Sequence, residues 1–252
     1  MLGCLGFCQT PDWNAPLVQT QTAPAPATQR EPIRLIDKAR LPDGGELLLL
    51  QSGDAFSIEL DDEELMGNTD HVSEEALASM TAKRVGRPNG SVLIGGLGMG
   101  FTLGAALKAW GPDARIEVAE LVPKILEWAN GPLAHVFAGK LDDPRVTVTL
   151  SDVHDVIAKG AGGRFDAILL DVDNGPDGFV QQDNDRLYGP AGLEAARQAL
   201  RVGGVLAIWS ADPDPRFTRT LRRAGFLAEA VAVPAYDGAR EDEHCLWFAR
   251  RP

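Results

Sequence analysis

A glycine-rich turn between an apolar segment and a helix-like segment constrains the fold of this chain more than any other feature. An apolar run, Val92 to Ile94, leads into a turn that holds four glycines, Gly95, Gly96, Gly98 and Gly100. Glycine lets the backbone adopt left-handed angles and approach a ligand closely. The free N–H groups of the following helix then point toward that ligand. The turn therefore predicts a nucleotide- or nucleoside-binding site, in which Met99 also lies.

An acidic residue at the end of the next strand-like run supports this interpretation. Glu120 lies 22 residues after Gly98 and follows the run 115–119. A carboxylate at that distance is placed to accept hydrogen bonds from ribose hydroxyls. Phe101 occupies the place of the third glycine in the G-x-G-x-x-G dinucleotide motif. We therefore expect a nucleoside with a sulfonium tail rather than a dinucleotide.

Apolar runs and turn residues predict an α/β fold with a doubly wound, mostly parallel sheet. Short strands near the N-terminus, separated by Gly-, Asp- and Pro-containing turns, predict a small antiparallel β unit. The strands are expected at 33–36, 46–51, 55–60, 91–94, 115–119, 146–150, 165–170, 205–209, 228–233 and 245–249. The helices are expected from 73, and at 100–110, 123–129, 153–158, 191–200 and 214–224, with Ser73 capping the first and Gly203 and Gly204 closing the fifth.

Changes in composition along the chain predict three parts. Residues 1–32 are rich in Pro, Gln, Thr and Ala without an apolar period, and we expect them to be a disordered N-terminal extension. Residues 33–88 are expected to form the small β unit and a connecting helix. Residues 89–252 are expected to form a Rossmann-like binding domain.

Charge and composition exclude several classes of partner. The chain has 252 residues and a formal net charge of −12, which disfavours nucleic acid and anionic membranes and suits a small cationic molecule. No segment has the length and apolarity of a membrane span. The three cysteines and four histidines show no metal-ligand spacing, so we expect no metal and a reducing, cytoplasmic location.

Two aspartates follow strand-like runs and lie where ligands bind in such sheets. Asp152 follows the run 146–150, and it is either the N-cap of the next helix or the acceptor of an adenine amino group. Asp171 follows the run 165–170, and it could orient an amine and accept its proton. The alternative for Asp171 is a solvated turn rich in Asp and Asn.

Further acidic residues extend this candidate site. Asp173, Asn174 and Asp177 belong to the acidic loop that begins at Asp171, and such a loop would attract a cation. Glu74 and Glu75 open the first expected helix, where they could instead simply complement its dipole.

From about Phe56 to the C-terminus the chain resembles the spermidine synthase family. The segments that carry the resemblance are Ile94–Thr102, which is similar to the family's glycine turn, Ala119–Pro123, Asp143–Asp152, Leu187–Pro190 and Leu200–Leu206. The resemblance implies a small β domain followed by a Rossmann-like domain of the class I methyltransferase type. It also implies aminopropyl transfer from decarboxylated S-adenosylmethionine to polyamines, with ribose at Glu120, adenine at Asp152, catalysis by Asp171 and, by analogy, a homodimer.

The chain departs from the family's pattern where the substrates bind. Met99 stands in place of the family's turn aspartate, which holds the donor's aminopropyl nitrogen. In the loop after Asp171, Asn174 and Gly175 stand in place of the family's Asp-Pro. Glu74 and Glu75 occupy the places of a tyrosine and a glutamine that contact the polyamine. Without a carboxylate at position 99, the turn loses an attraction to an ammonium tail and a repulsion against the carboxylate of intact S-adenosylmethionine.

Three functional hypotheses follow. The first is a transferase that binds S-adenosylmethionine at Gly96, Gly98, Met99, Gly100, Glu120 and Asp152 and moves its methyl group to a small, cationic amine. The alternative is aminopropyl transfer from decarboxylated S-adenosylmethionine to a polyamine, with Glu74, Glu75 and Asp173 replacing the missing contacts. A second alternative is a nucleoside-binding protein without catalytic activity.

Overall fold

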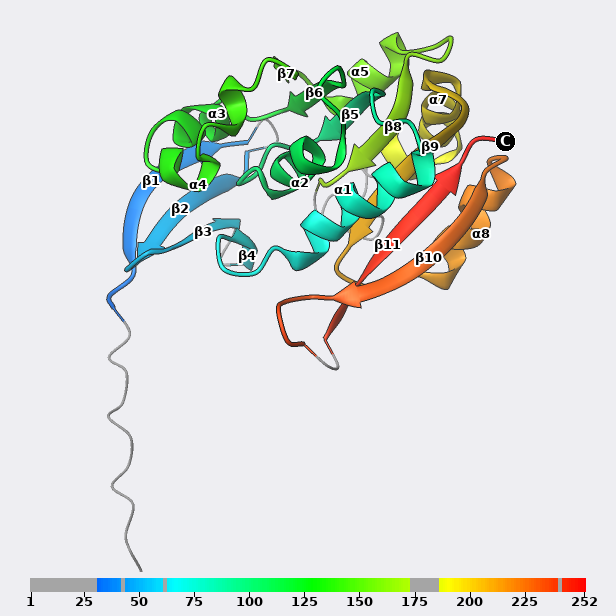
Figure 1. Ribbon diagram of the computed structural model, residues 1–252. Coiled ribbons are helices and arrows are strands. Elements are labelled where there is room, and N and C mark those ends of the chain that lie inside the picture. The colour runs from blue at the N-terminus through cyan, green and yellow to red at the C-terminus, as the bar shows by residue number, and fades with distance from the viewer. Residues whose placement is uncertain (1–30, 42–43, 61–62, 173–185, 240–241) are drawn as a thin grey trace, which may run out of the picture. The chain divides into compact units, whose positions relative to one another are not determined.

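Alternating strands and helices build a central sheet covered on both faces (Figure 1). The computed structural model describes residues 31–41, 44–60, 63–172, 186–239 and 242–252. The strands are β1 (Arg34–Arg40), β2 (Glu46–Ser52), β3 (Ala55–Leu60), β4 (Glu63–Gly67), β5 (Ser91–Gly95), β6 (Arg115–Glu120), β7 (Val146–Leu150), β8 (Phe165–Leu170), β9 (Leu200–Ser210), β10 (Leu227–Pro234) and β11 (Glu243–Arg250). The helices are α1 (Val72–Val85), α2 (Phe101–Ala109), α3 (Pro123–Asn130), α4 (Ala134–Phe137), the 3-10 turn η1 (Lys140–Asp142), α5 (Val153–Lys159), α7 (Pro190–Ala199) and α8 (Pro215–Arg223).

The described strands form two sheets. Strands β1 to β4 pair antiparallel in chain order, which confirms the expected small β unit. The larger sheet has the order β10-β11-β9-β8-β5-β6-β7, in which β5 to β9 run parallel and β11 runs antiparallel to both neighbours. The expected α/β fold with a mostly parallel sheet is therefore confirmed.

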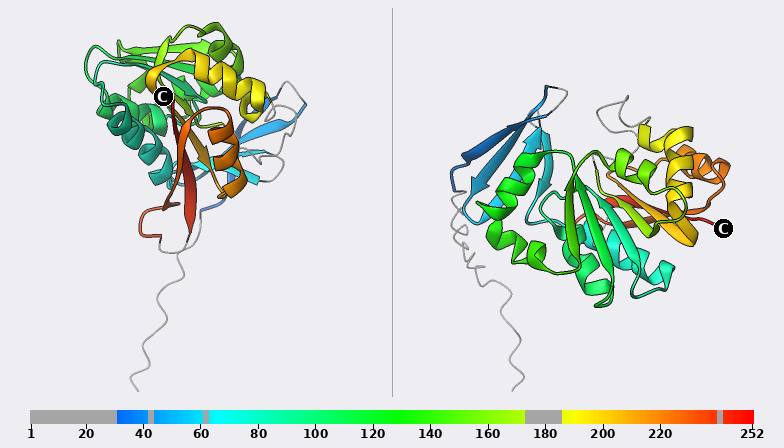
Figure 2. Two further views of the ribbon diagram at one scale, coloured as in Figure 1. Left: turned by 90° about the vertical axis from the view of Figure 1, so that its right-hand side faces the viewer. Right: turned by 90° about the horizontal axis from the view of Figure 1, so that it is seen from above.

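Helices cover both faces of the large sheet (Figure 2), and apolar side chains of these helices are buried against it. Helices α1, α2 and α3 cover one face, and α5, α7 and α8 cover the other. All six residues of β8 are buried, as expected for a strand with neighbours on both edges and helices on both faces. The chain reverses direction across the sheet between β5 and β8, and ligands bind at such a switch point beyond the carboxyl ends of the strands.

Two local predictions were wrong, and three short elements, β4, α4 and η1, were not predicted. Gly203 and Gly204 do not cap a helix: α7 ends at Ala199, and both glycines lie within β9, where the sheet register shifts and Gly203 has φ of +81°. Helix α1 begins at Val72, so Ser73 lies inside the helix and is buried instead of capping it. The short elements β4, α4 and η1 are too brief for a periodic pattern.

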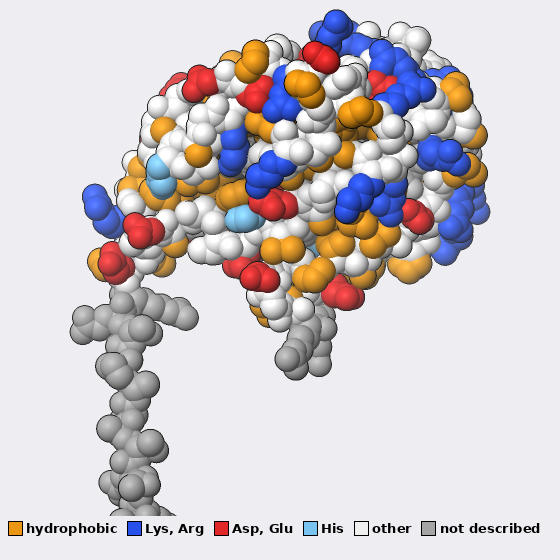
Figure 3. Space-filling model, viewed as in Figure 1, with side chains coloured by type: hydrophobic (Ala, Val, Ile, Leu, Met, Phe, Trp, Pro, Cys, Tyr) orange, Lys and Arg blue, Asp and Glu red, His pale blue; other side chains and the backbone are white. Residues whose placement is uncertain are grey.

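The N-terminal sheet contacts the Rossmann-like part through polar groups as well as apolar ones. The Trp128 Nε1–H group of α3 donates a hydrogen bond of 2.9 Å to Asp37 Oδ2 of β1, and Lys124 Nζ lies 3.2 Å from the same oxygen. None of the described helices is both long and apolar enough to cross a membrane. On the face that Figure 3 shows, basic side chains are interspersed with acidic ones, so the net charge of −12 does not make this face uniformly negative.

Candidate functional site

The glycine turn lies at the switch point of the sheet, between the carboxyl ends of β5 and β8. Gly96, Gly98 and Gly100 have φ angles of +88°, +49° and +75°, which residues with side chains rarely adopt. The Gly96 N–H donates to the Ala119 carbonyl oxygen of β6 at 2.9 Å, so the turn is tied to the neighbouring strand. A Cβ atom at Gly96 would lie 2.4 Å from the Asp171 carbonyl oxygen. Glycine at position 96 therefore lets the turn and the end of β8 approach each other.

The Glu120 side chain holds the glycine turn in place from the end of β6. Its Oε2 accepts a 2.8 Å hydrogen bond from the Leu97 N–H, and its Oε1 accepts one of the same length from the Val122 N–H. The side chain is buried, and this burial raises its pKa, while the backbone hydrogen bonds oppose the shift. The backbone N–H groups of Leu121 and Gly98 also interact with this carboxylate, so the ribose hydroxyls that the sequence predicts would share its oxygens with the backbone.

Replacing Glu120 with glutamine is expected to destabilise the fold. The amide NH2 group would face one of the two N–H donors, and a buried donor without an acceptor costs about 1–3 kcal/mol. We expect urea denaturation to show a loss of that size in the free energy of unfolding. The control is Glu127→Gln on α3, whose carboxylate is mostly exposed and pairs with Lys124. Equal stability of the two variants would contradict the proposed role of Glu120 in holding the turn.

Asp152 is the N-cap of α5, one of the two roles that the sequence left open. Its Oδ1 accepts a 2.8 Å hydrogen bond from the His154 N–H, and its Oδ2 accepts one of 3.0 Å from Arg186 Nη1. Arg186 Nη2 also lies 3.5 Å from Asp155 Oδ1. The adenine-binding role remains a prediction, and it would require adenine to share the oxygens that the cap and Arg186 use.

Asp171 directly follows β8 as a partly buried carboxyl group, and Thr102 is its hydrogen-bond partner. Thr102 Oγ1 lies 2.5 Å from Asp171 Oδ2 and 3.4 Å from the Glu74 carbonyl oxygen. Burial, and then the nearby negative charge of Glu74, raise the pKa of Asp171 to about 7, while the Thr102 hydrogen bond opposes the shift. A carboxyl group with this pKa exchanges a proton near neutral pH, as a general base must.

The geometry around Thr102 suits both protonation states of Asp171. When Asp171 is ionised, the Thr102 hydroxyl donates to it. When Asp171 carries a proton, it donates to Thr102 Oγ1, and the Thr102 hydrogen turns to the Glu74 carbonyl oxygen. Sequence reasoning did not identify Thr102 as a site residue, although it directly follows the glycine turn and Phe101.

Of the two glutamates at the start of α1, the structure brings only Glu74 to Asp171. The Glu74 side chain accepts a 2.6 Å hydrogen bond from Ser73 Oγ, and burial raises its pKa. Glu75 lies one residue, or about 100°, further around the helix. It lines a groove of about 810 Å³ between α1 and α2, where its Oε1 lies 3.4 Å from His71 Nδ1 and 3.9 Å from Lys108 Nζ.

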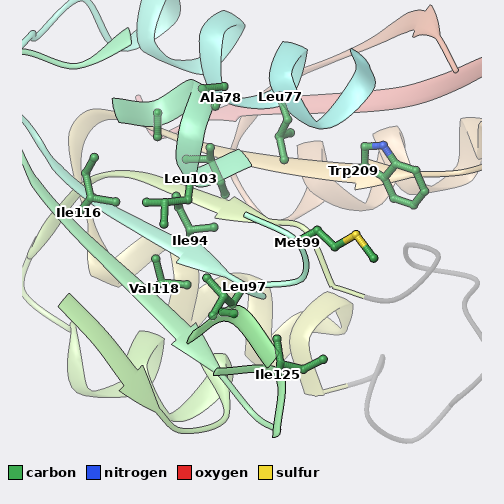
Figure 4. Close-up of a cluster of buried hydrophobic side chains, with 14 of the residues drawn as sticks. Leu77, Ala78, Ile94, Leu97, Met99, Leu103, Ile116, Val118, Ile125 and Trp209 are labelled. Atoms are coloured by element: carbon green, nitrogen blue, oxygen red, sulfur yellow. The ribbon is translucent and has the colours of Figure 1, made fainter. Parts of the chain in front are cut away.

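Met99 and the acidic loop complete the predicted site residues. The Met99 side chain is 2% exposed and belongs to a cluster of buried hydrophobic residues with Leu77 and Trp209 (Figure 4). A methionine in such surroundings offers a donor molecule no charge. Asp173, Asn174 and Asp177 lie outside the described residues, as do residues 1–30 of the expected N-terminal extension.

Met66 of β4 is another contact that sequence reasoning missed. A Cβ atom at Gly98 would lie 2.9 Å from Met66 Sδ, so the N-terminal sheet contacts the glycine turn directly. No sequence signal pointed to this contact, because β4 is short and begins with two glutamates.

The curated relatives of the chain include transferases that are named for polyamines or for putrescine. No family model matches the chain. It is 32% identical over 157 residues to the polyamine aminopropyltransferase of Mycobacterium tuberculosis, a match that covers 58% of this chain and 29% of that protein. It is 28% identical over 132 residues to putrescine N-methyltransferase 4 of Nicotiana tabacum, covering 52% of this chain and 32% of the relative. The chain thus spans about a third or less of the length of these curated relatives.

The fold has a close counterpart among solved structures. A spermidine synthase in complex with the transition-state analogue AdoDATO matches with a TM-score of 0.70 and 22% identity, over 87% of this chain and 74% of that one. The curated relatives, the aminopropyltransferase and the putrescine N-methyltransferase, are both transferases. The chain is therefore a homologue of the polyamine aminopropyltransferases, and it has the fold of a spermidine synthase.

Proposed function

We propose that this chain transfers an aminopropyl group from decarboxylated S-adenosylmethionine to a small polyamine. The observation that carries the proposal is the pair of partly buried carboxyl groups, Asp171 and Glu74, beside the glycine turn. A partly buried acidic site of this kind favours a cationic amine. The similarity to the polyamine aminopropyltransferase of M. tuberculosis supports this proposal over methyl transfer, which was the first hypothesis from the sequence.

The residues around the turn suit a donor with a nucleoside and a sulfonium group. The glycine turn has no side chains at three of its positions, so a donor could approach its backbone, and the Glu120 oxygens would accept hydrogen bonds from the ribose. Asp152 and Arg186 lie at the carboxyl end of β7, the predicted place of the adenine. These residues would position the donor, and such positioning supplies a large part of the rate enhancement in a displacement reaction.

The proposed reaction is an in-line displacement at the carbon attached to the sulfonium sulfur. The acceptor nitrogen forms a bond to that carbon, the carbon–sulfur bond breaks, and its electron pair stays on sulfur, which leaves as a neutral thioether. An amine must be unprotonated to attack, and the new secondary ammonium loses a further proton. Asp171 is placed to take up such a proton, because its raised pKa of about 7 makes it a stronger base than an exposed aspartate.

Calorimetric titration with the two donors, followed by turnover with putrescine, tests the proposal. We expect tighter binding of decarboxylated S-adenosylmethionine than of the intact form, and a product heavier than putrescine by one aminopropyl group in mass spectra. A preference for the intact donor and a methylated product would establish the second candidate, methyl transfer. Binding of neither donor would refute both enzymatic functions.

Methyl transfer remains the second candidate because Met99 provides no carboxylate in the donor turn. The Nicotiana tabacum relative, named for putrescine N-methylation, also supports this alternative. Each hypothesis makes a different claim about position 99, so a variant at this position separates them.

Introducing a charge at position 99 is expected to change donor choice. A carboxylate near the donor tail would attract the ammonium of the decarboxylated donor and repel the carboxylate of the intact donor. Such a contact is worth on the order of a few kcal/mol at intermediate dielectric. We expect Met99→Asp to shift the ratio of the two dissociation constants toward the decarboxylated donor by about tenfold or more.

The control for this variant is Met99→Asn, which has nearly the same size and polarity without the charge. Both substitutions place a polar group in a buried cluster, so both lose stability, and only the difference between them reports the charge. An equal donor ratio in the two variants would show that position 99 does not face the donor tail.

A further inference from the structure

Ser73 connects Glu74, which lies beside Asp171 in the proposed acceptor site, to His244 of β11. The side chain is fully buried, and its Oγ has three polar neighbours from three different elements. Glu74 Oε2 of α1 lies at 2.6 Å, Trp209 Nε1 of β9 at 3.0 Å and His244 Nδ1 of β11 at 2.9 Å. The Trp209 and His244 rings also pack edge to face, with centroids 4.8 Å apart. Their packing holds both ring nitrogens at the Ser73 hydroxyl.

The number of donors and acceptors sets the direction of these hydrogen bonds. A hydroxyl group has one hydrogen to donate and two lone pairs, and the tryptophan Nε1–H is only a donor. When Glu74 is ionised, its carboxylate takes the Ser73 hydrogen, so both lone pairs of Oγ accept hydrogen bonds. His244 must then carry a hydrogen on Nδ1. In the ionised state of Glu74, His244 therefore donates a hydrogen bond to Ser73, and Ser73 donates one to Glu74.

The same three groups are also satisfied in the opposite direction. When Glu74 carries a proton, it donates to Ser73 Oγ, and the Ser73 hydrogen turns to His244 Nδ1. His244 then carries its hydrogen on Nε2. Trp209 still donates to the second lone pair of Ser73 in this state. The network thus has two complete arrangements that differ by the protonation of Glu74.

We propose that Ser73 and His244 conduct protons between the acceptor site and solvent, with Glu74 as the inner end of the path. In one concerted step, the Glu74 proton moves to Ser73 Oγ and the Ser73 hydrogen moves to His244 Nδ1. This step leaves Glu74 ionised and His244 as an imidazolium, which releases its Nε2 hydrogen to water. The inference rests on the proposed function, because an amine acceptor must lose protons during group transfer.

The surroundings of the two ends favour movement outward. Burial lowers the pKa of His244, and the negative charge of Asp212 only partly opposes this shift, so the imidazolium gives up its proton readily. His244 is only partly buried. At the inner end, burial raises the pKa of Glu74. The hydrogen bonds from Ser73 and from its own backbone N–H, and the charge of His71, lower this pKa, and the charge of Asp70 raises it. Ser73 and His244 are positioning residues in this proposal, because Ser73 contacts Glu74 and His244 contacts Ser73, and both act through Glu74 rather than on the substrates.

Nuclear magnetic resonance of the histidine ring nitrogens tests the network in the resting protein, without any turnover. We expect His244 to carry its hydrogen on Nδ1 in the wild type above pH 8. Glu74→Leu removes the acceptor of the Ser73 hydrogen, so we expect the hydrogen of His244 to move to Nε2. A His244 tautomer that does not change in Glu74→Leu would overturn the proposal, since Glu74 acts on His244 only through Ser73.

Turnover measured with decarboxylated S-adenosylmethionine and putrescine at low buffer concentration tests the path itself. We expect Ser73→Ala and His244→Ala to lower kcat by about tenfold or more. Added imidazole should restore His244→Ala, because it can take the place of the missing ring, and should not restore Ser73→Ala. Thr81→Ala is the matched control, because Thr81 is an equally buried hydroxyl on α1 that bonds only to the Leu77 carbonyl.

The two measurements distinguish failure of this inference from failure of the proposed function. If the wild type turns over its substrates and Ser73→Ala and His244→Ala have the same kcat as the wild type and the control Thr81→Ala, the proton path is refuted while the proposed function stands. If the wild type neither binds nor turns over either of the two donors, the proposed function is refuted. The tautomer measurement then still decides whether Glu74 controls His244 through Ser73.

Discussion

Asp171→Asn is expected to lower turnover by about 10²–10⁴-fold, the usual contribution of a positioned general base, while donor binding stays close to wild type. Asparagine keeps the shape of aspartate, and its amide can donate to Thr102 Oγ1 as a protonated aspartate does. It cannot take a proton from the acceptor. Steady-state kinetics with putrescine and calorimetric titration with the donor measure the two quantities separately.

The pH dependence of the wild type provides a second readout of the same group. Because the pKa of Asp171 is raised to about 7, the fraction of the active, ionised form should increase as the pH rises from 6 to 8, and kcat should rise with it. Asp171→Asn should lack this rise. Unchanged activity in Asp171→Asn would remove Asp171 from the catalytic assignment.

Stability should depend on pH in the opposite direction. The folded state holds the Asp171 proton more tightly than the unfolded chain, whose pKa is near 3.8, so ionisation destabilises the fold as the pH rises through this interval toward 7. Asp171→Asn removes this cost. We expect the stability of the variant relative to wild type to increase between pH 4 and pH 7 and then to level off, as urea denaturation at a series of pH values would show.

Gly96→Ala is expected to destabilise the protein by about 3 kcal/mol or more and to abolish donor binding. An alanine at φ of +88° costs about 1–2 kcal/mol by itself. Its Cβ would also lie 2.4 Å from the Asp171 carbonyl oxygen, which belongs to the backbone and cannot rotate away. Relieving this overlap moves the end of β8 away from the turn, at a further cost typical of overpacking.

The matched control is Gly162→Ala. Gly162 has a similar φ of +98°, and a Cβ atom there would meet nothing within 4 Å, so this variant measures the backbone cost alone. The difference in the free energy of unfolding between the two variants therefore reports the contact between position 96 and Asp171. Equal losses in the two variants would mean that the turn and β8 separate at no cost.

Sequence patterns predicted the elements that carry the site, because each has a clear local signal. The run before Gly95 and the run before Asp171 are continuous and apolar, as expected for strands buried on both faces. The residue that follows such a strand lies at the carboxyl edge of the sheet, so Glu120 and Asp171 were identified as candidates. Gly203 was misjudged for the same local reason, since glycine after a helical pattern resembles a C-cap, whereas the pairing of Leu200 with Phe165 continues the chain as a strand.

The neighbours of the candidate residues could not be predicted from local patterns. Glu74 and Glu75 are equivalent in the sequence, and only the packing of α1 decides that Glu74 contacts Ser73 while Glu75 lies beside Lys108. Thr102 has a common residue type at a helix start, and nothing in its sequence context indicates a bond to Asp171.

The sequence by itself determined the order of strands and helices, the glycine turn and the carboxylates at the strand ends, because periodicity and turn chemistry are properties of neighbouring residues. Only the tertiary structure decided which of these groups meet. The pairing of β5 with β8 brings Asp171 to Gly96, and the packing of α1 on β9 and β11 brings Ser73 to His244, 171 residues away. Such contacts depend on how buried surfaces fit together, and this fit also raises the pKa of Asp171 by removing water from it.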